Sequence, residues 1–149
     1  INYDDSINLI KVSAILDKYG WLGPEALGQQ GSATIFLVIQ HADLKPQQKY
    51  LPMMREAVKN NQASPADLAL LEDRVALREG RKQIYGSQIH GSPDGHPWIS
   101  PIEDPDNVDK RRAEVGLEPL AEYVKRYNIQ WNLAEYKKQL PEIEKKDKW

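Results

Sequence analysis

The stretch SPADLALLEDRVALREG, residues 64–80, constrains the fold of this chain more than any other part of its sequence. Ser64 can cap the N-terminus of a helix, Pro65 suits a first helical position, and Gly80 suits the residue that ends one. Between these ends, leucine, valine and alanine recur at helical spacing. The pattern therefore predicts an α-helix in the middle of the chain.

Similar patterns predict helices elsewhere. The apolar residues 32–42 are rich in β-branched side chains and could form a buried strand, but their length and Ser32 as an N-cap favour a helix. The glycine-rich residues before this stretch should form a loop. Pro52 falls inside another helical pattern and should kink that helix or restart it. The helices are expected at about residues 5–19, 32–42, 44–62, 64–80 and 104–128, with a break in the last one near Gly116 and Pro119.

A small β-hairpin is expected between the last two of these helices. Residues 83–89 and 96–102 alternate weakly between apolar and polar side chains, and the turn-forming sequence HGSPDG separates them. The predicted fold is mainly α, with about five helices and a small β-hairpin in a single compact domain, residues 1–134. The highly charged residues 135–149 are expected to form a C-terminal tail.

Charge and composition exclude several classes of function. The net charge of −2 gives no electrostatic case for binding nucleic acid or anionic membranes. The longest apolar run is far shorter than the ~20 residues of a membrane-spanning helix, so no membrane insertion is expected. The chain has no cysteine, which excludes thiol catalysis and cysteine metal sites. The sequence also contains no P-loop, G-x-S-x-G or H-E-x-x-H motif.

Two ionisable residues lie on faces that should be apolar. His41 ends the most apolar stretch, so its ring should be partly desolvated and neutral, the form that acts as a base. Asp73 lies among small apolar residues of its helix, and a buried carboxylate is normally paired. If Asp73 faces His41, it would orient the imidazole, as in hydrolase triads. Alternatively, His41 caps a helix C-terminus and Asp73 pairs with Arg74 to pin two helices.

A second group of polar residues lies in the sequence QIYGSQ, residues 83–88. On a strand, Gln83, Tyr85 and Ser87 would share one face, which would offer hydrogen-bonding groups and an aromatic wall to a polar ligand. An edge strand with an ordinary polar exterior is the alternative. The segment is therefore a candidate binding surface.

Other charged residues are less specific candidates. Arg111 and Arg112 could clamp a carboxylate or a phosphate, or could form ion pairs on a helix surface. His90, Asp94 and His96 could meet across the hairpin and hold a metal ion, but their spacing is not diagnostic. A solvated loop is the expected environment of these three residues, and neither a metal nor a cofactor is predicted.

The segments IQHAD, LLEDR, YGSQ, PIEDP, VDKRR and GLEPL follow one another in this order. They resemble the motifs of a bacterial family catalogued as domain-of-unknown-function family 6624, and the resemblance covers about Asn8 to Tyr123. It implies that the functional positions are polar and that Pro93 and the two neighbouring histidines are variable. Because members in Bacteroidetes often look exported, it also implies a periplasmic or cell-surface location. The signature positions that it marks are Gln40, His41, Asp43, Asp73, Arg74, Gln83, Tyr85, Gly86, Gln88, Asp104, Arg111 and Arg112.

Three hypotheses follow. The first is a hydrolase-like enzyme that acts on a small polar substrate, with His41 as the base and Asp73 as its orienting partner. The second is a non-catalytic module that binds a small polar ligand or a protein partner through Trp21, Tyr85 and Trp98. The third is that the polar signature is purely structural. In the first hypothesis, the substrate-binding residues are Gln40, Arg74, Gln83, Tyr85, Gln88 and Arg112.

Overall fold

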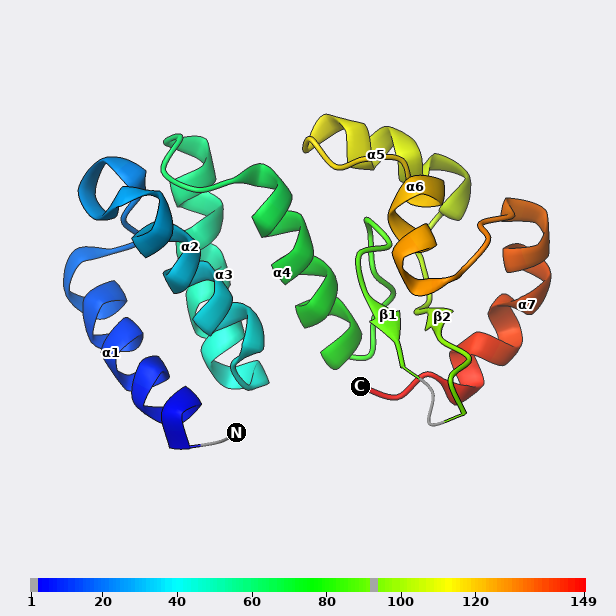
Figure 1. Ribbon diagram of the computed structural model, residues 1–149, viewed down its shortest axis with the longest axis horizontal. Helices are drawn as coiled ribbons and strands as arrows, with labels where there is room; N and C mark the ends of the chain where they lie inside the picture. The colour runs from blue at the N-terminus through cyan, green and yellow to red at the C-terminus, as the bar shows by residue number, and fades with distance from the viewer. Residues whose placement is uncertain (1–2, 92–93) are drawn as a thin grey trace. The chain divides into compact units, whose positions relative to one another are not determined.

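A computed structural model describes residues 3–91 and 94–149, and this part of the chain is mainly helical (Figure 1). Seven α-helices and two short 3-10 helices are present in the described residues. The helices are α1 (Tyr3–Tyr19), α2 (Pro24–His41), α3 (Leu44–Lys59), α4 (Pro65–Arg78), η1 (Pro105–Asn107), α5 (Val108–Glu114), α6 (Leu120–Val124), η2 (Lys125–Tyr127) and α7 (Leu133–Lys146). The mainly α class is confirmed, whereas the expected number of about five helices is wrong.

The number of helices differs from the prediction for two reasons. The helical segment at residues 104–128 had been counted once, and its predicted break near Gly116 and Pro119 is confirmed: it forms α5 and α6, because Gly116 takes a positive φ of 78° and Pro119 has no N–H to donate. The charged residues predicted as a tail include most of α7, and Tyr136 and Ile143 are buried on one face of this helix. The many charged residues on the exposed face of α7 therefore made its amphipathic pattern hard to recognise in the sequence.

The predicted helix boundaries are partly correct. Ser64 caps α4, since its Oγ accepts a hydrogen bond from the Asp67 N–H at 3.3 Å, as predicted. The apolar residues 32–42 are helical down to His41, but α2 begins earlier, at Pro24, and Gly28 kinks it with φ 73°. The expected glycine-rich loop is thus largely helical. Helix α3 runs through Pro52 without restarting.

The β-hairpin is present in a short form. Strand β1 (Ile89–His90) pairs antiparallel with β2 (Trp98–Ile99). Residues 83–88 do not continue the strand and make one isolated bridge, from Gln83 to Ile102. Two residues of the predicted turn, Ser92 and Pro93, lie outside the described residues.

The chain divides into two compact units, Ile1–Leu71 and Glu72–Trp149, called unit 1 and unit 2 below. In unit 1, α1 packs against α2, and α2 packs against α3. In unit 2, the apolar core gathers side chains of the hairpin, α5, α6 and α7. Its buried members are Ile99, Ile102, Val108, Leu120, Val124, Tyr136 and Ile143. Among the described residues, no helix is both long enough and apolar enough to cross a membrane.

Candidate functional site

The carboxylate of Asp73 holds the irregular segment at residues 83–88, called the 83–88 loop below. Its Oδ1 accepts hydrogen bonds from the backbone N–H groups of Ile84 at 2.7 Å and Tyr85 at 3.0 Å. Its Oδ2 accepts one from the N–H of Ser87 at 2.9 Å. The Asp73 residue is 0% exposed. Helix α4 therefore presents a buried acceptor that fixes three backbone donors of the loop.

Two arginines of α5 bind the carbonyl groups of the same loop. Arg111 donates from Nε to the carbonyl oxygen of Ile84 at 2.8 Å. Arg112 donates from Nη1 to the carbonyl oxygen of Tyr85 at 2.8 Å and from Nε to that of Glu118 at 2.6 Å. The Arg112 residue is 1% exposed. These guanidinium groups thus bind main-chain carbonyls of the protein itself. One of their predicted roles had been to clamp a carboxylate or a phosphate.

Tyr123 of α6 completes the support of the loop. Its hydroxyl donates to the carbonyl oxygen of Ser87 at 2.7 Å. The Arg112 and Arg126 guanidinium carbons lie 4.9 Å and 5.6 Å from the centre of its ring. Burial, followed by the hydrogen bond with Tyr127, raises the pKa of the Tyr123 hydroxyl, so it remains a donor at neutral pH. Tyr123 was not among the candidate residues predicted from the sequence, although it lies three residues after the GLEPL motif.

Two glutamines of the loop bond within the protein. The Gln83 amide nitrogen donates to the carbonyl oxygens of Gln88 at 3.1 Å and Ser100 at 2.8 Å, and its oxygen accepts from the Gln88 N–H. The Gln88 side chain accepts from Arg74 Nε at 2.9 Å and donates to Ser87 Oγ at 3.0 Å. Both glutamines are buried. Their amides therefore shape the loop from inside.

The electrostatics follow from this burial. Burial raises the pKa of the Asp73 carboxyl, and the hydrogen bonds from Ser87, Tyr85 and Ile84 oppose the rise. Burial also lowers the pKa of the Arg74 and Arg112 guanidinium groups. Charged groups are tolerated here because hydrogen bonds compensate for the water they have lost.

Close packing adds to the polar support at Gly86. This residue takes a φ of 67°, which side chains rarely adopt. A Cβ atom on it would lie 3.1 Å from Ile102 Cδ1 and 3.2 Å from Leu120 Cδ1. The positive φ also explains why this segment is a loop and not the expected strand.

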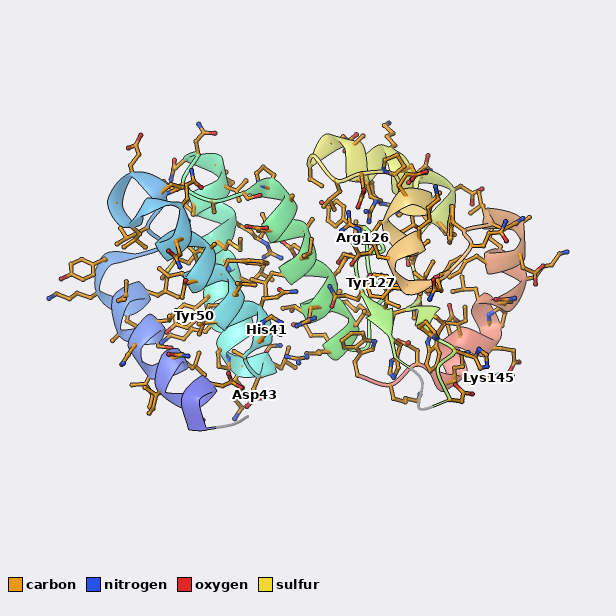
Figure 2. The ribbon with its side chains drawn as sticks, in the orientation of Figure 1. His41, Asp43, Tyr50, Arg126, Tyr127 and Lys145 are labelled. Carbon is orange, nitrogen blue, oxygen red and sulfur yellow. The ribbon has the colours of Figure 1, made fainter. Side chains whose placement is uncertain are left out.

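His41 lies in unit 1, at the C-terminal end of α2, where Figure 2 labels it. His41 is exposed to solvent, so the prediction that its ring would be partly desolvated is wrong. Nδ1 lies 2.9 Å from the carbonyl oxygen of Leu37, which can only accept, so Nδ1 carries the proton of this bond. The ring lines a cleft of about 390 Å³ with Asp5, Asn8 and Leu9 of α1.

The predicted catalytic residues belong to different units. His41 bonds to a carbonyl of its own helix, whereas Asp73 accepts from the 83–88 loop of unit 2. Gln40, a predicted substrate-binding residue of unit 1, is 4% exposed and donates to the Leu70 carbonyl oxygen at 3.4 Å. The pairing of His41 with Asp73 stays a prediction.

The histidines of the hairpin have different surroundings. His90 stacks on Trp98 with the ring centres 4.5 Å apart, and its Nδ1 lies 3.3 Å from Asp147 Oδ1, so a solvated loop is the wrong description of this residue. His96 is exposed. Within the described ranges, no three histidine or acidic side chains are grouped as a metal site would require.

Trp21, one of the three aromatic residues predicted to contact a partner, is 4% exposed and belongs to the core. Tyr85 and Trp98 are half-buried. Burial raises the pKa of the Tyr85 hydroxyl, and so do the negative charges of Asp73 and Glu72. Tyr85 is the aromatic residue of the 83–88 loop, and it is partly exposed to solvent.

Comparison with known proteins gives one match. The model of the family of unknown function DUF6624 matches residues 2–134. No curated protein and no solved structure matches the chain. The matched residues contain the 83–88 loop together with Asp73, Arg111, Arg112 and Tyr123, which hold it.

Proposed function

We propose that this chain, which belongs to the family of unknown function DUF6624, is a non-catalytic module. The module would bind a small polar ligand or a protein partner. In this proposal, the polar signature positions build a rigid loop, and the exposed part of that loop makes the contact. The second and third hypotheses from the sequence are thereby combined, because the structural network serves a binding surface.

The hydrogen bonds of Asp73 carry the proposal. A carboxylate that orients a catalytic histidine must offer an oxygen to the imidazole N–H. Both oxygens of Asp73 already accept from backbone N–H groups at 2.7 to 3.0 Å, and the residue is 0% exposed. This geometry favours a supporting role for Asp73 over a catalytic one.

Tyr85 is the proposed contact residue. It is half-buried, and its hydroxyl experiences the charges of Glu72, Glu114 and Arg111. An aromatic ring surrounded by charges of both signs suits a polar ligand or the polar rim of a protein interface. Because the backbone under Tyr85 is fixed on both sides, little conformational entropy is lost when a ligand binds.

Nuclear magnetic resonance tests this proposal. The ¹⁵N-labelled chain is titrated with amino acids, sugars, nucleotides and dicarboxylates while the amides of Ile84, Tyr85 and Ser87 are followed. A ligand should shift these signals, and Tyr85→Ala should remove the response while the control Tyr127→Ala retains it. Turnover of chromogenic ester or phosphate substrates that is lost in both His41→Ala and Asp73→Asn would contradict a non-catalytic module.

A hydrolase-like enzyme is the second candidate, and one observation favours it. The Leu37 carbonyl fixes the proton of His41 on Nδ1, which leaves Nε2 as the acceptor of a neutral ring in a cleft of about 390 Å³. Asp5 lines the same cleft and is the carboxylate to vary. Loss of turnover in His41→Ala, with folding unchanged, would support this candidate.

A further inference from the structure

Trp131 lines two hollows on the surface of unit 2. It lies in the segment between η2 and α7. The first hollow has a volume of about 160 Å³ and the second about 430 Å³, and both are lined by Ile129, Gln130 and Trp131. One half-buried indole therefore serves two adjoining surfaces.

The residues beneath Trp131 hold it in place. Its ring packs against Tyr136 with the centres 5.0 Å apart and the planes inclined at 49°. The Tyr136 hydroxyl accepts from the Ile102 N–H at 2.8 Å and donates to the Ser100 carbonyl oxygen at 3.0 Å. Tyr136 is 6% exposed, so the indole rests on a fixed aromatic residue of the core.

Polar side chains with planar amide or carboxylate groups line part of the smaller hollow, beside apolar residues such as Trp98 and Ile143. Asn132, Glu135 and Gln139 line it from the first turns of α7. Asn132 caps the helix by accepting from the Glu135 N–H at 3.0 Å, and Gln139 donates to Glu135 Oε1 at 2.9 Å. All three residues are exposed. They place hydrogen-bonding groups beside the indole at positions set by one helix.

The larger hollow, which Trp131 also lines, has similar polar side chains. Asn128 and Glu122 line it together with Lys125, whose Nζ bonds to Glu122 at 2.7 Å. The one basic side chain lining these two hollows is thus paired with an acid. The Glu135 carboxylate, which accepts from Gln139, meets no cation among the described residues that line the smaller hollow, so a phosphate or other anion is disfavoured there.

The lining fits a ligand with an apolar face and hydroxyl edges. A pyranose ring has this character, since its C–H groups can lie on an indole while its hydroxyls bond to amides and carboxylates. The smaller hollow is below the ~300 to 1,000 Å³ typical of drug-sized ligands, which suits a single ring. The second hollow leaves room for further sugar rings of the same oligosaccharide.

We propose that Trp131 is the stacking platform of a site for neutral oligosaccharides, with one sugar ring beside Gln139 and the next ones across the indole. This proposal rests on the proposed function only in treating the chain as a binding module. It names a surface and a ligand class that the 83–88 loop does not require.

Titration of the full chain with maltohexaose, cellohexaose, xylohexaose and chitotetraose tests the proposal. At least one should shift the indole N–H signal of Trp131, and adenosine monophosphate should not. Trp131→Ala should weaken binding by about tenfold or more, the size of a strong aromatic contact. The control Trp149→Ala, which removes an indole that is 42% exposed and lines neither hollow, should leave binding unchanged.

A second variant covers the case in which Trp131→Ala fails to fold. Gln139→Ala changes an exposed helix residue and should weaken sugar binding several-fold with the melting temperature unchanged. No response of the Trp131 indole to any of the four sugars, binding that neither variant weakens, or a response to the nucleotide alone would each overturn the proposal. If the amides of the 83–88 loop still respond to another ligand, the proposed function survives that failure.

Discussion

The two units bury different kinds of side chain. In the described residues of unit 1, the buried polar side chains are Gln40 and Gln47, among apolar residues of α1, α2 and α3. Gln47 donates to the carbonyl oxygens of Gln40 at 2.8 Å and Ile39 at 3.3 Å. Unit 2 buries a larger polar set, which is Asp73, Gln83, Ser87, Gln88, Ser100 and Arg112.

The difference follows from how backbone groups find partners. Helices satisfy their own N–H and C=O groups, so apolar side chains suffice to pack them. The 83–88 loop has no such ladder, and its backbone groups bond to Asp73, Arg111, Arg112 and Tyr123 instead. Buried polar residues are therefore a consequence of placing an irregular segment in a core.

The largest expected effect comes from Asp73→Ala. The change leaves three backbone N–H groups buried without their acceptor, which should lower the free energy of unfolding by about 3–5 kcal/mol. Urea denaturation followed by circular dichroism measures it. Asp43→Ala, in unit 1, is the control, because Asp43 is exposed and its side chain makes no capping bond to α3. If both variants lowered the free energy of unfolding by the same small amount, a buried polar side chain of unit 2 would matter no more than an exposed one of unit 1.

Two glycine variants separate backbone strain from close packing. Gly80 and Gly86 both have positive φ, 76° and 67°. Gly80→Ala should lower the free energy of unfolding by about 1–2 kcal/mol, because only the left-handed backbone conformation disfavours the new side chain. Gly86→Ala adds contacts at 3.1 and 3.2 Å to Ile102 and Leu120 and should cost about 1–2 kcal/mol more. Thermal unfolding of the two proteins gives the comparison, and a smaller loss for Gly86→Ala would contradict the tight packing of the loop.

Removing one hydroxyl should have an intermediate effect. Tyr123→Phe deprives the Ser87 carbonyl of a donor at 2.7 Å and should lower the free energy of unfolding by about 1–2 kcal/mol. Tyr127→Phe is the matched control, since Tyr127 is 40% exposed. Urea midpoints measure both. If Tyr127→Phe lowered the free energy of unfolding as much as Tyr123→Phe, the hydrogen bond to the Ser87 carbonyl would not be the cause of the loss.

The smallest effect should lie in unit 1 and depend on pH. Hydrogen bonds from Lys49 and then Tyr50 lower the pKa of the Asp17 carboxyl. Because the folded-state pKa lies below the unfolded value of about 3.9, the stabilisation is complete above that value and is lost as pH falls through the folded pKa. Asp17→Asn should therefore lower the urea midpoint slightly at pH 7 and not at pH 2. A difference that persists at pH 2 would contradict this origin.

The helices could be predicted because their signals are local. Ser64 and Gly80 lie at the two ends of one short pattern, and the structure uses both as predicted. Helix α7 was missed because its buried residues, Tyr136 and Ile143, are seven positions apart in a charged sequence. Local patterning thus predicts an element when its ends are marked and its apolar face is dense.

The site could be predicted only in part. Asp73 was predicted to face the interior, and it is buried. Arg112, Gln83 and Gln88 were singled out as candidate binding residues, and the structure buries their side chains. Their partners could not be inferred, since Arg111 is 27 residues from Ile84 and Tyr123 is 36 from Ser87. The unusual residue is visible in a sequence, whereas the backbone group that it binds is determined by the fold.

Amide hydrogen exchange in the native chain tests the central claim most directly. If Asp73 fixes the 83–88 loop, the amides of Ile84, Tyr85 and Ser87 should exchange as slowly as those in the middle of α4, and Asp73→Asn should accelerate all three together. Exchange of these amides in the native protein at the rate of the exposed turn residue Gly95 would contradict a rigid loop built by the polar signature.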